Sequence, residues 1–258
     1  IYILISFSGS KKNFNKKNIN LILKSINQEQ KKYNFFLIGG DTTLSRISQF
    51  TVCSIGYSKK IIKRNYCSFG DDIYLTGNIG DSSIGLKILK NKIKTSNKFK
   101  KYFVNQYFKP KLAYGFHREL LKFASSSMDV SDGLLIDLKK LIGSKTKGFI
   151  IDYNLLPKST YLKKLNFENK INIKKHLFNG DDYQILFTVK KKYRNIVFKY
   201  SKKWSQKVTR IGTITNRKEN YLKINNNLKK IVDYQGYIHN FNWDYLLFFG
   251  FFFVLSAF

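Results

Sequence analysis

The sequence predicts a mixed α/β (α+β) fold in which an incomplete N-terminal β-α-β-β unit precedes a larger C-terminal α/β domain. Apolar runs of strand length alternate along the chain with segments in which apolar residues recur every three or four positions. A length of 258 residues allows one large domain or two ordinary ones, and 43% apolar residues can fill a core. We therefore expect a globular protein.

The N-terminal unit begins with a strand at about residues 2–7, which the apolar run Ile1–Ile5 indicates is buried. A helix ending near Lys32 follows, with one face marked by Ile19, Ile22, Leu23 and Ile26. A second strand at 34–38 leads into Gly39-Gly40-Asp41-Thr42-Thr43, and residues 49–57 predict another strand.

The larger domain begins with a strand at 72–77 that turns at glycines into a helix at about 83–90. Residues 91–101 are polar and basic and indicate a loop or a frayed helical end. Pro110 suits the first turn of a further helix, because proline is favoured there. That helix would present Leu112, Phe116, Leu120 and Phe123 on its apolar face.

A short strand through Met128 enters Asp129-Val130-Ser131-Asp132-Gly133, and a leucine stripe from Leu134 to Leu141 predicts the next helix. A strand at 184–189, a helix at about 193–204 and a strand at 208–214 complete the pattern. We place the domain boundary near residue 70. The domains are then 1–70 and 71–241, with a hydrophobic tail at 242–258.

The chain is strongly basic, with 47 Lys and Arg against 16 Asp and Glu and a formal charge of +31. Such a charge raises nucleic acid as a partner. Only six of the basic residues are Arg, and the lysines are scattered and accompany abundant Asn, Ile, Phe and Tyr, which share A- and T-rich codons. Because base readout depends largely on Arg, a solvated lysine surface is favoured over a nucleic-acid interface.

Cysteine and histidine usage predicts neither a zinc site nor a disulfide framework, since Cys53 and Cys67 have no metal-ligand spacing. A reducing cytoplasm is the expected compartment. The N-terminus lacks the features of a signal peptide. Residues 245–258 carry no charge but are too few for a membrane span, so no span is expected.

The scarce acids concentrate at glycine turns, and eight of the 16 occur in five short clusters. Carboxylates beside glycines are typical of sites that hold hard cations and, behind them, phosphate. In the Asp129 cluster, strand periodicity places Asp129 and Ser131 on one face. Asp132 falls at the turn into the helix, where it either caps the helix or binds metal. A cation between Asp129 and Asp132 explains both carboxylates, and we favour it.

Gly40 and Asp41 follow a strand directly, so the glycine would let backbone approach a ligand while Asp41 projects from the strand end. The turn from Thr76 to Leu86 either cradles phosphate or uses its glycines for tight packing, and it is no P-loop. Adjacent Asp181 and Asp182 point opposite ways in extended backbone, so at most one faces a given site. Nothing forms a Ser-His-Asp or Cys-His arrangement.

Taken in order, these motifs resemble the thiamine-monophosphate kinase family, within the superfamily of aminoimidazole-ribonucleotide synthetase. The matching pieces are Leu37–Thr43, Arg64 ahead of Gly70–Gly77, Met128–Leu134, Gly180–Tyr183 and Gly236–His239, and the resemblance covers about residues 1–241. Asp-Val-Ser-Asp-Gly-Leu together with Gly-Asp-Asp-Tyr is its specific part. The resemblance implies the aminoimidazole-ribonucleotide synthetase-like fold.

The resemblance also implies direct in-line transfer of the ATP γ-phosphate to thiamine monophosphate, with Mg2+ and no covalent intermediate. By resemblance, Asp41, Asp129 and Asp132 hold Mg2+. Gly40, Asp41, Arg64 and Ser131 contact ATP, Asp181 and Tyr237 contact the thiamine moiety, and the protein is a homodimer. We expect Asp71, Asp72, Asp81 and Asp182 to be structural.

This sequence departs from the family pattern in two ways. The family carries a longer N-terminal segment with further magnesium-binding aspartates, so the sequence resembles a truncated kinase. Asn179 and Asp181 stand where the family has Gly and Glu, which at Asp181 keeps the charge on a shorter arm. Two alternatives remain open, namely an inactive fragment of that enzyme and a basic module that binds RNA or another polyanion.

Overall fold

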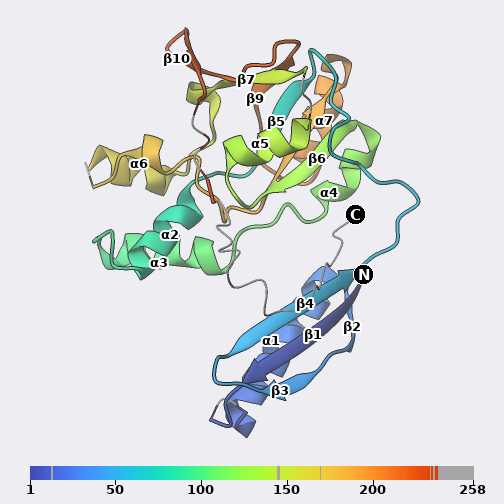
Figure 1. Ribbon diagram of the computed structural model, residues 1–258, viewed down its shortest axis with the longest axis vertical. Coiled ribbons are helices and arrows are strands. Elements are labelled where there is room, and N and C mark those ends of the chain that lie inside the picture. The colour runs from blue at the N-terminus through green and yellow to red at the C-terminus, as the bar shows by residue number, and fades with distance from the viewer. Residues whose placement is uncertain (13, 144–145, 169, 233, 235, 238–258) are drawn as a thin grey trace, which may run out of the picture. The chain divides into compact units, whose positions relative to one another are not determined.

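The computed structural model describes residues 1–12, 14–143, 146–168, 170–232, 234, 236 and 237. The chain divides into two compact units, Ile1–Ile61 and Ile62–Phe258, and each is described by itself (Figure 1). The roles assigned to the predicted domains stay predictions. The hydrophobic tail and His239 lie outside the described residues.

The first unit is a four-stranded sheet with one long helix. Its elements are β1 (Tyr2–Gly9), α1 (Lys16–Tyr33), β2 (Phe36–Gly39), β3 (Thr42–Leu44) and β4 (Gln49–Ile55). Strands β2 and β3 pair in parallel with successive halves of β1, and β4 pairs antiparallel along nearly its whole length. The predicted β-α-β-β order is confirmed, with β3 as an additional short strand.

Helix α1 begins at an asparagine cap, because the Asn15 side chain accepts a hydrogen bond from the Asn18 amide at 2.9 Å. It ends at Asn34, which adopts the left-handed conformation with φ of 53°. Of the predicted apolar stripe, Ile19, Ile22 and Ile26 are half-buried, whereas Leu23 is exposed. Residues 1–5 were predicted to form a buried strand. The strand is present as β1, but it is not buried, since its residues up to Ser8 are half-buried or exposed. Within this unit, no residue of α1 or β4 is buried, so the sheet lacks a closed core.

The second unit holds a seven-stranded sheet in the order β11-β10-β7-β9-β5-β8-β6, antiparallel except for the β10 and β7 pair. The strands are β5 (Asp72–Thr76), β6 (Ala124–Val130), β7 (Gly148–Asp152), β8 (Gln184–Val189), β9 (Val208–Thr215), β10 (Tyr221–Ile224) and β11 (Asn227–Lys230). The helices are α2 (Asp81–Leu89), α3 (Asn97–Phe108), α4 (Phe116–Glu119), α5 (Leu134–Ile142), α6 (Thr160–Phe167) and α7 (Arg194–Lys203), with short 3-10 turns between them.

This sheet is covered on both faces, because alternate residues of its central strand enter different cores. On β5, Ile73 and Leu75 join the larger core with leucines of α5, whereas Tyr74 joins a smaller core with Phe116 and Val197. Helices α2, α3, α5 and α6 contribute to the first core, and α4 and α7 to the second. The unit is therefore an α/β domain, as predicted, and it has three layers.

Two predicted segments of the second unit differ from the structure. Within the polar run 91–101, α3 already begins at Asn97, because Phe99 and Phe103 pack in the larger core while the intervening lysines face solvent. The helix predicted from Pro110 begins only at Phe116, after Gly115 at φ of 86°. A Cβ on Gly115 would lie 2.5 Å from the Trp204 ring, so only glycine fits at this turn before the helix.

The strands and helices predicted near 72–77, 83–90, 134–141, 184–189, 193–204 and 208–214 are confirmed to within a few residues. The prediction did not include β7, β10, β11 or α6. Among the described residues, no helix is both long and apolar enough to cross a membrane.

Candidate functional site

The candidate site is the turn that links β6 to α5 in the second unit. Strand β6 ends at Val130 and α5 begins at Leu134, so Ser131, Asp132 and Gly133 form the turn itself. Asp129 is an exposed residue of β6, two positions before Ser131. Strand alternation therefore places Asp129 and Ser131 on one side, as the sequence predicted.

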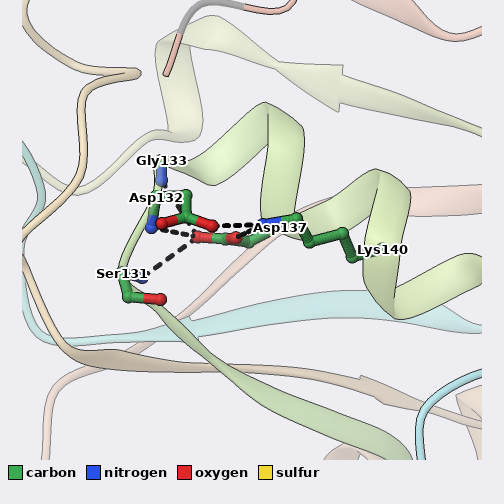
Figure 2. Close-up of polar contacts among 5 residues, drawn as sticks. All are labelled: Ser131, Asp132, Gly133, Asp137 and Lys140. Atoms are coloured by element: carbon green, nitrogen blue, oxygen red, sulfur yellow. Dashed lines mark hydrogen bonds and ion pairs between the residues drawn. The ribbon is translucent and has the colours of Figure 1, made fainter. Parts of the chain in front are cut away.

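The backbone of this turn is held by Asp137, one turn into α5 (Figure 2). Its Oδ2 accepts hydrogen bonds from the amides of Ser131, Asp132 and Gly133, each at 3.0 Å. The suggestion that Asp132 caps this helix is therefore wrong, since the carboxylate that accepts these backbone bonds belongs to Asp137. Successive amides of this kind bind anions, and here the protein's own carboxylate fills the position.

The carbonyl groups of the same turn join it to the other sequence motifs. Asp181 donates its amide to the Ser131 carbonyl at 2.8 Å, and Tyr237 donates to the Asp132 carbonyl at 2.8 Å. Tyr183 bonds the Val130 carbonyl in the same way. Because the turn's amides and these carbonyls are paired within the protein, the turn offers its side chains to a ligand.

Gly180 is required by the close approach of two of these segments. A Cβ at Gly180 would lie 1.9 Å from the Ser131 carbonyl oxygen, so no larger residue fits without moving the backbone. Gly133 is similarly confined, with φ of 133° and the Phe178 carbonyl oxygen 2.1 Å from where a Cβ would lie. The glycines of both motifs thus bring backbone against backbone and align Asp181 with the turn.

The carboxylates around the turn influence one another electrostatically. Burial raises the pKa of Asp181, the charge of Asp132 raises it further, and Lys90 opposes both. Burial also raises the pKa of Tyr183, and the charges of Asp181, Asp129 and Asp132 add to that rise. All three acids therefore act on Tyr183, and Asp132 and Asp181 repel each other, a repulsion that a cation beside them would relieve.

Beside these acids lies a hollow of about 630 Å³. Asp132, Asp181 and Tyr237 line it, together with Lys87 of α2 and Lys90, which directly follows that helix. Lys87 donates to the Nδ1 atom of His176 at 3.1 Å, and burial lowers the pKa of His176 to about 4, so the ring is neutral and accepts. The hollow thus combines carboxylates with ammonium groups, which suits a ligand that carries phosphate together with a cation.

Sequence reasoning missed Asp137, Lys87 and Lys90. The two lysines could have been found from their spacing, since residues three apart on a helix lie on one face together with Ser83. Asp137 could have been suspected as an acid within a leucine stripe, because a buried charge needs partners.

The turn from β5 to α2, for which phosphate binding and packing were both open, is already filled by a carboxylate. Buried Asp182 accepts a hydrogen bond from the Gly80 amide at 2.8 Å at the start of α2. Gly85, inside the helix, would place a Cβ 2.2 Å from the Phe103 carbonyl oxygen of α3. These contacts support the packing interpretation and a structural role for Asp182.

Three further acids of the second unit, Asp71, Asp72 and Asp81, also have partners inside the fold. Asp72 is buried and accepts bonds from Arg194 at 2.6 and 2.8 Å and from Arg210 at 2.9 Å. Asp71 accepts from the Ser68 amide at 2.9 Å. Asp81 accepts from Ser159 and Tyr102. Each holds neighbouring segments together, in keeping with the predicted structural roles.

In the first unit, Gly40 and Asp41 interrupt the line of β2 and β3 along β1. A Cβ on Gly40 would lie 1.8 Å from the Ile5 carbonyl oxygen, so this glycine serves a close approach to β1. The Asp41 carboxylate accepts from the Thr42 amide at 2.7 Å and is exposed. Both residues lie between the end of β2 and the start of β3, where the Asp41 side chain is exposed.

Arg64 is exposed in the second unit, beside Asn65, whose amide donates to the Leu141 carbonyl at 2.8 Å. Leu141 lies near the C-terminal end of α5, whereas Ser131 and Asp132 precede its N-terminal end. The structure thus joins Ser131, Asp132, Asp181 and Tyr237 directly and places Arg64 toward the far end of that helix.

The donors at the turn fit Mg2+ by their chemistry. Asp129, Asp132 and Asp181 offer carboxylate oxygens and Ser131 a hydroxyl, which are the hard ligands that Mg2+ prefers. Within the described part of the chain, no three His, Cys, Asp or Glu side chains gather closely enough to hold a metal by themselves. This agrees with Mg2+ sites that use one or two carboxylates plus water and substrate phosphates.

Residues 69–225 match the family described as AIR synthase related protein, C-terminal domain. The chain belongs to this family. The matched range begins just before β5 and ends after β10, so it contains the candidate turn and most of the seven-stranded sheet of this AIR synthase related protein.

Curated relatives of this AIR synthase related chain are thiamine-monophosphate kinases. The chain is 33% identical over 211 residues to that of Buchnera aphidicola subsp. Acyrthosiphon pisum, which covers 81% of this chain and 65% of the relative. It is 31% identical over 210 residues to that of Escherichia coli K12, covering 80% and 64%. The chain thus spans just under two thirds of these relatives' length.

Solved structures share the fold. The crystal structure of thiamine monophosphate kinase from Aquifex aeolicus has a TM-score of 0.74 at 25% identity, covering 89% of this chain and 74% of that chain. A second structure, AaThiL complexed with AMPPCP and TMP, has a TM-score of 0.72 at 25% identity, covering 89% and 72%. E. coli HypE, a hydrogenase maturation protein, reaches 0.67 at 13% identity over 91% of this chain and 73% of that chain and shares the fold alone.

Proposed function

We propose that this protein is an ATP- and Mg2+-dependent phosphotransferase that converts thiamine monophosphate to thiamine diphosphate. The observation that carries the proposal is the turn at Ser131–Gly133. Its amides are occupied by Asp137, and its acidic side chain, Asp132, borders a hollow that lysines also line. The relatives named thiamine-monophosphate kinase and the structure with AMPPCP and TMP support it.

In this proposal Asp129, Asp132 and Asp41 hold Mg2+, and Gly40, Asp41, Arg64 and Ser131 contact ATP. When bound, Mg2+ neutralises phosphate charge and aligns the oxygens for in-line displacement. Asp181 and Tyr237, which line the same hollow as Asp132, bind the thiamine moiety. Their backbone bonds to the Ser131 and Asp132 carbonyls hold the substrate residues in register with the cation residues.

Lys87 and Lys90 are proposed to bind the phosphate of the acceptor substrate. Both line the same hollow as Asp132 and Asp181: Lys87 is a half-buried residue of α2, and Lys90 is the exposed residue that follows the helix. An ammonium group on each side chain supplies point charges for phosphate oxygens. Such a reaction needs positioning and charge neutralisation and no protein nucleophile, which agrees with a site built from acids, lysines and one serine.

The test is conversion of thiamine monophosphate in the presence of ATP and Mg2+, followed by chromatography of thiamine diphosphate. We compare wild type with Asp132→Asn and with a matched control, Asp152→Asn. Both aspartates are paired with lysine, and their side chains are 23% and 22% exposed. Loss of one charged ligand at the site is expected to lower the rate by about 100-fold or more, as removal of a preorganised charge does.

Equal rates for Asp132→Asn and Asp152→Asn would contradict the role of the turn. An absence of product with wild type, while Mg2+ and ATP still raise its thermal stability, would favour the inactive-fragment alternative. The same assay in a chain extended by the N-terminal segment of a relative then tests whether further residues are required.

We also propose that the protein acts in the cytoplasm as a homodimer. Both cysteines, exposed Cys53 and buried Cys67, are free thiols, which suits a reducing compartment. Sedimentation analysis at several protein concentrations tests the dimer, and a single species of one-chain mass at all of them would contradict it.

A further inference from the structure

Asp137 is buried, with a side chain that is 0% exposed, and nothing in the proposed chemistry uses it directly. Its Oδ2 accepts three backbone amides, and its Oδ1 lies 3.4 Å from the ammonium of Lys140. Burial raises the pKa of Asp137, while the Gly133 amide and the charge of Lys140 oppose the rise. The surrounding donors therefore compensate a charge that would otherwise be costly to bury.

Lys140 also forms an ion pair and hydrogen bond with Asp132, so one ammonium bridges the two carboxylates. Figure 2 shows Asp137 facing the turn, with Lys140 one turn further along α5. The Lys140 side chain is 42% exposed, so its ammonium can leave Asp132 for solvent at little cost. A divalent cation that binds Asp132 would therefore compete with the Lys140 ammonium for the carboxylate oxygens of Asp132.

We propose that Asp137 and Lys140 are positioning residues for Asp132: Asp137 fixes the turn and anchors Lys140, and Lys140 neutralises the Asp132 carboxylate until a divalent cation displaces it. The inference rests on the proposed function, because it takes Asp132 as a cation ligand. In addition to that function, the Lys140 ammonium competes with the cation and so sets the strength of cation binding at the turn.

The experiment measures Mn2+ affinity of the full chain, with Mn2+ alone as the probe and free Mn2+ detected by electron paramagnetic resonance. Lys140→Met removes the competitor and is expected to tighten binding about twofold to fivefold, the range of an exposed ion pair. Lys223→Met is the matched control, because Lys223 is 39% exposed and pairs with Asp152 at 3.5 Å. It is expected to leave the affinity unchanged.

Asp137→Asn keeps an oxygen for the amides but releases Lys140 to bind Asp132 alone. We expect Mn2+ affinity to fall about tenfold, since a charged partner of this kind is worth about one pKa unit of interaction. Adding Lys140→Met to that variant is expected to restore part of the affinity, which a merely structural role would not. Asp72→Asn, which alters another fully buried carboxylate, is expected to lower thermal stability without changing Mn2+ affinity.

Unchanged Mn2+ affinity in Lys140→Met would overturn the inference, as would an Asp137→Asn affinity equal to that of Asp72→Asn. An absence of Mn2+ binding by wild type would overturn it as well. If Asp137→Asn does not fold, Lys140→Met alone decides. If the affinities change as expected but no thiamine diphosphate forms, the inference stands and the proposed function falls.

Discussion

Asp81 offers a quantitative test of the second unit's packing. It is only 5% exposed at the start of α2 and accepts hydrogen bonds from Ser159 at 2.7 Å and Tyr102 at 2.9 Å. Burial raises its pKa from 3.8 to about 6, although both hydroxyls and Lys207 favour the charged form. Between pH 3.8 and about 6, the folded state therefore holds a proton that the unfolded chain has already lost.

The order of these two pKa values determines how the free energy of unfolding changes with pH. The contribution of the protonated carboxyl is fully present below pH 3.8, is lost as the pH rises through about 6, and stays constant above it. A difference of about 2 pKa units corresponds to about 3 kcal/mol in the free energy of unfolding. Asp81→Asn cannot ionise, and its amide group can still pair with the two hydroxyls, which also accept hydrogen bonds.

The assay is urea unfolding of wild type and Asp81→Asn between about pH 4 and about pH 7, followed by fluorescence. As the pH rises over that interval, we expect the free energy of unfolding of Asp81→Asn to increase by about 3 kcal/mol relative to that of wild type. Asp152→Asn, at a half-exposed aspartate, should show no such trend. A difference between Asp81→Asn and wild type that does not change with pH would refute the reasoning.

Two further predictions concern stability. Gly180→Ala is expected to cost about 3 kcal/mol, because the new Cβ overlaps the Ser131 carbonyl oxygen. Gly70→Ala, where φ is 80° but no atom lies within 4 Å, should cost only about 1 kcal/mol, and equal losses in thermal unfolding would contradict this. Asp72→Ala should cost about 2 kcal/mol through the lost bonds to Arg194 and Arg210, whose side chains stay hydrated at 45% and 44% exposure. Urea denaturation checks this, and a change within 0.5 kcal/mol, about that of a neutral surface substitution, would contradict it.

Periodicity and glycine placement sufficed to predict most of the second unit, because its strands and helices bury regular apolar faces. The leucines of α5 and the apolar run of β8 are examples. Segment 97–108 was missed because only Phe99 and Phe103 are buried in it, and its first half is rich in lysine. The helix expected from Pro110 fails for a tertiary reason, since Gly115 must pass the Trp204 ring.

The sequence was enough to select the acidic residues of the candidate site, but not the contacts that hold them in place. Asp132 looked like a helix cap or a metal ligand, and only the structure shows that Asp137 takes the amides. Which carboxylate reaches those amides depends on side-chain direction, which residue spacing does not determine. Asp182 does turn inward to α2, but strand alternation is not the reason, because Asp181 has φ of 69° and its backbone is not extended.

The central claim is that the acidic side chains at the turn after β6 bind a divalent cation. Anomalous diffraction from crystals grown with Mn2+ and ATP tests it most directly. We expect a Mn2+ peak about 2.1 Å from a carboxylate oxygen of Asp132, with Lys140 turned away from it. A map with no peak at Asp129 or Asp132, and with the Lys140 ion pair intact, would contradict the account.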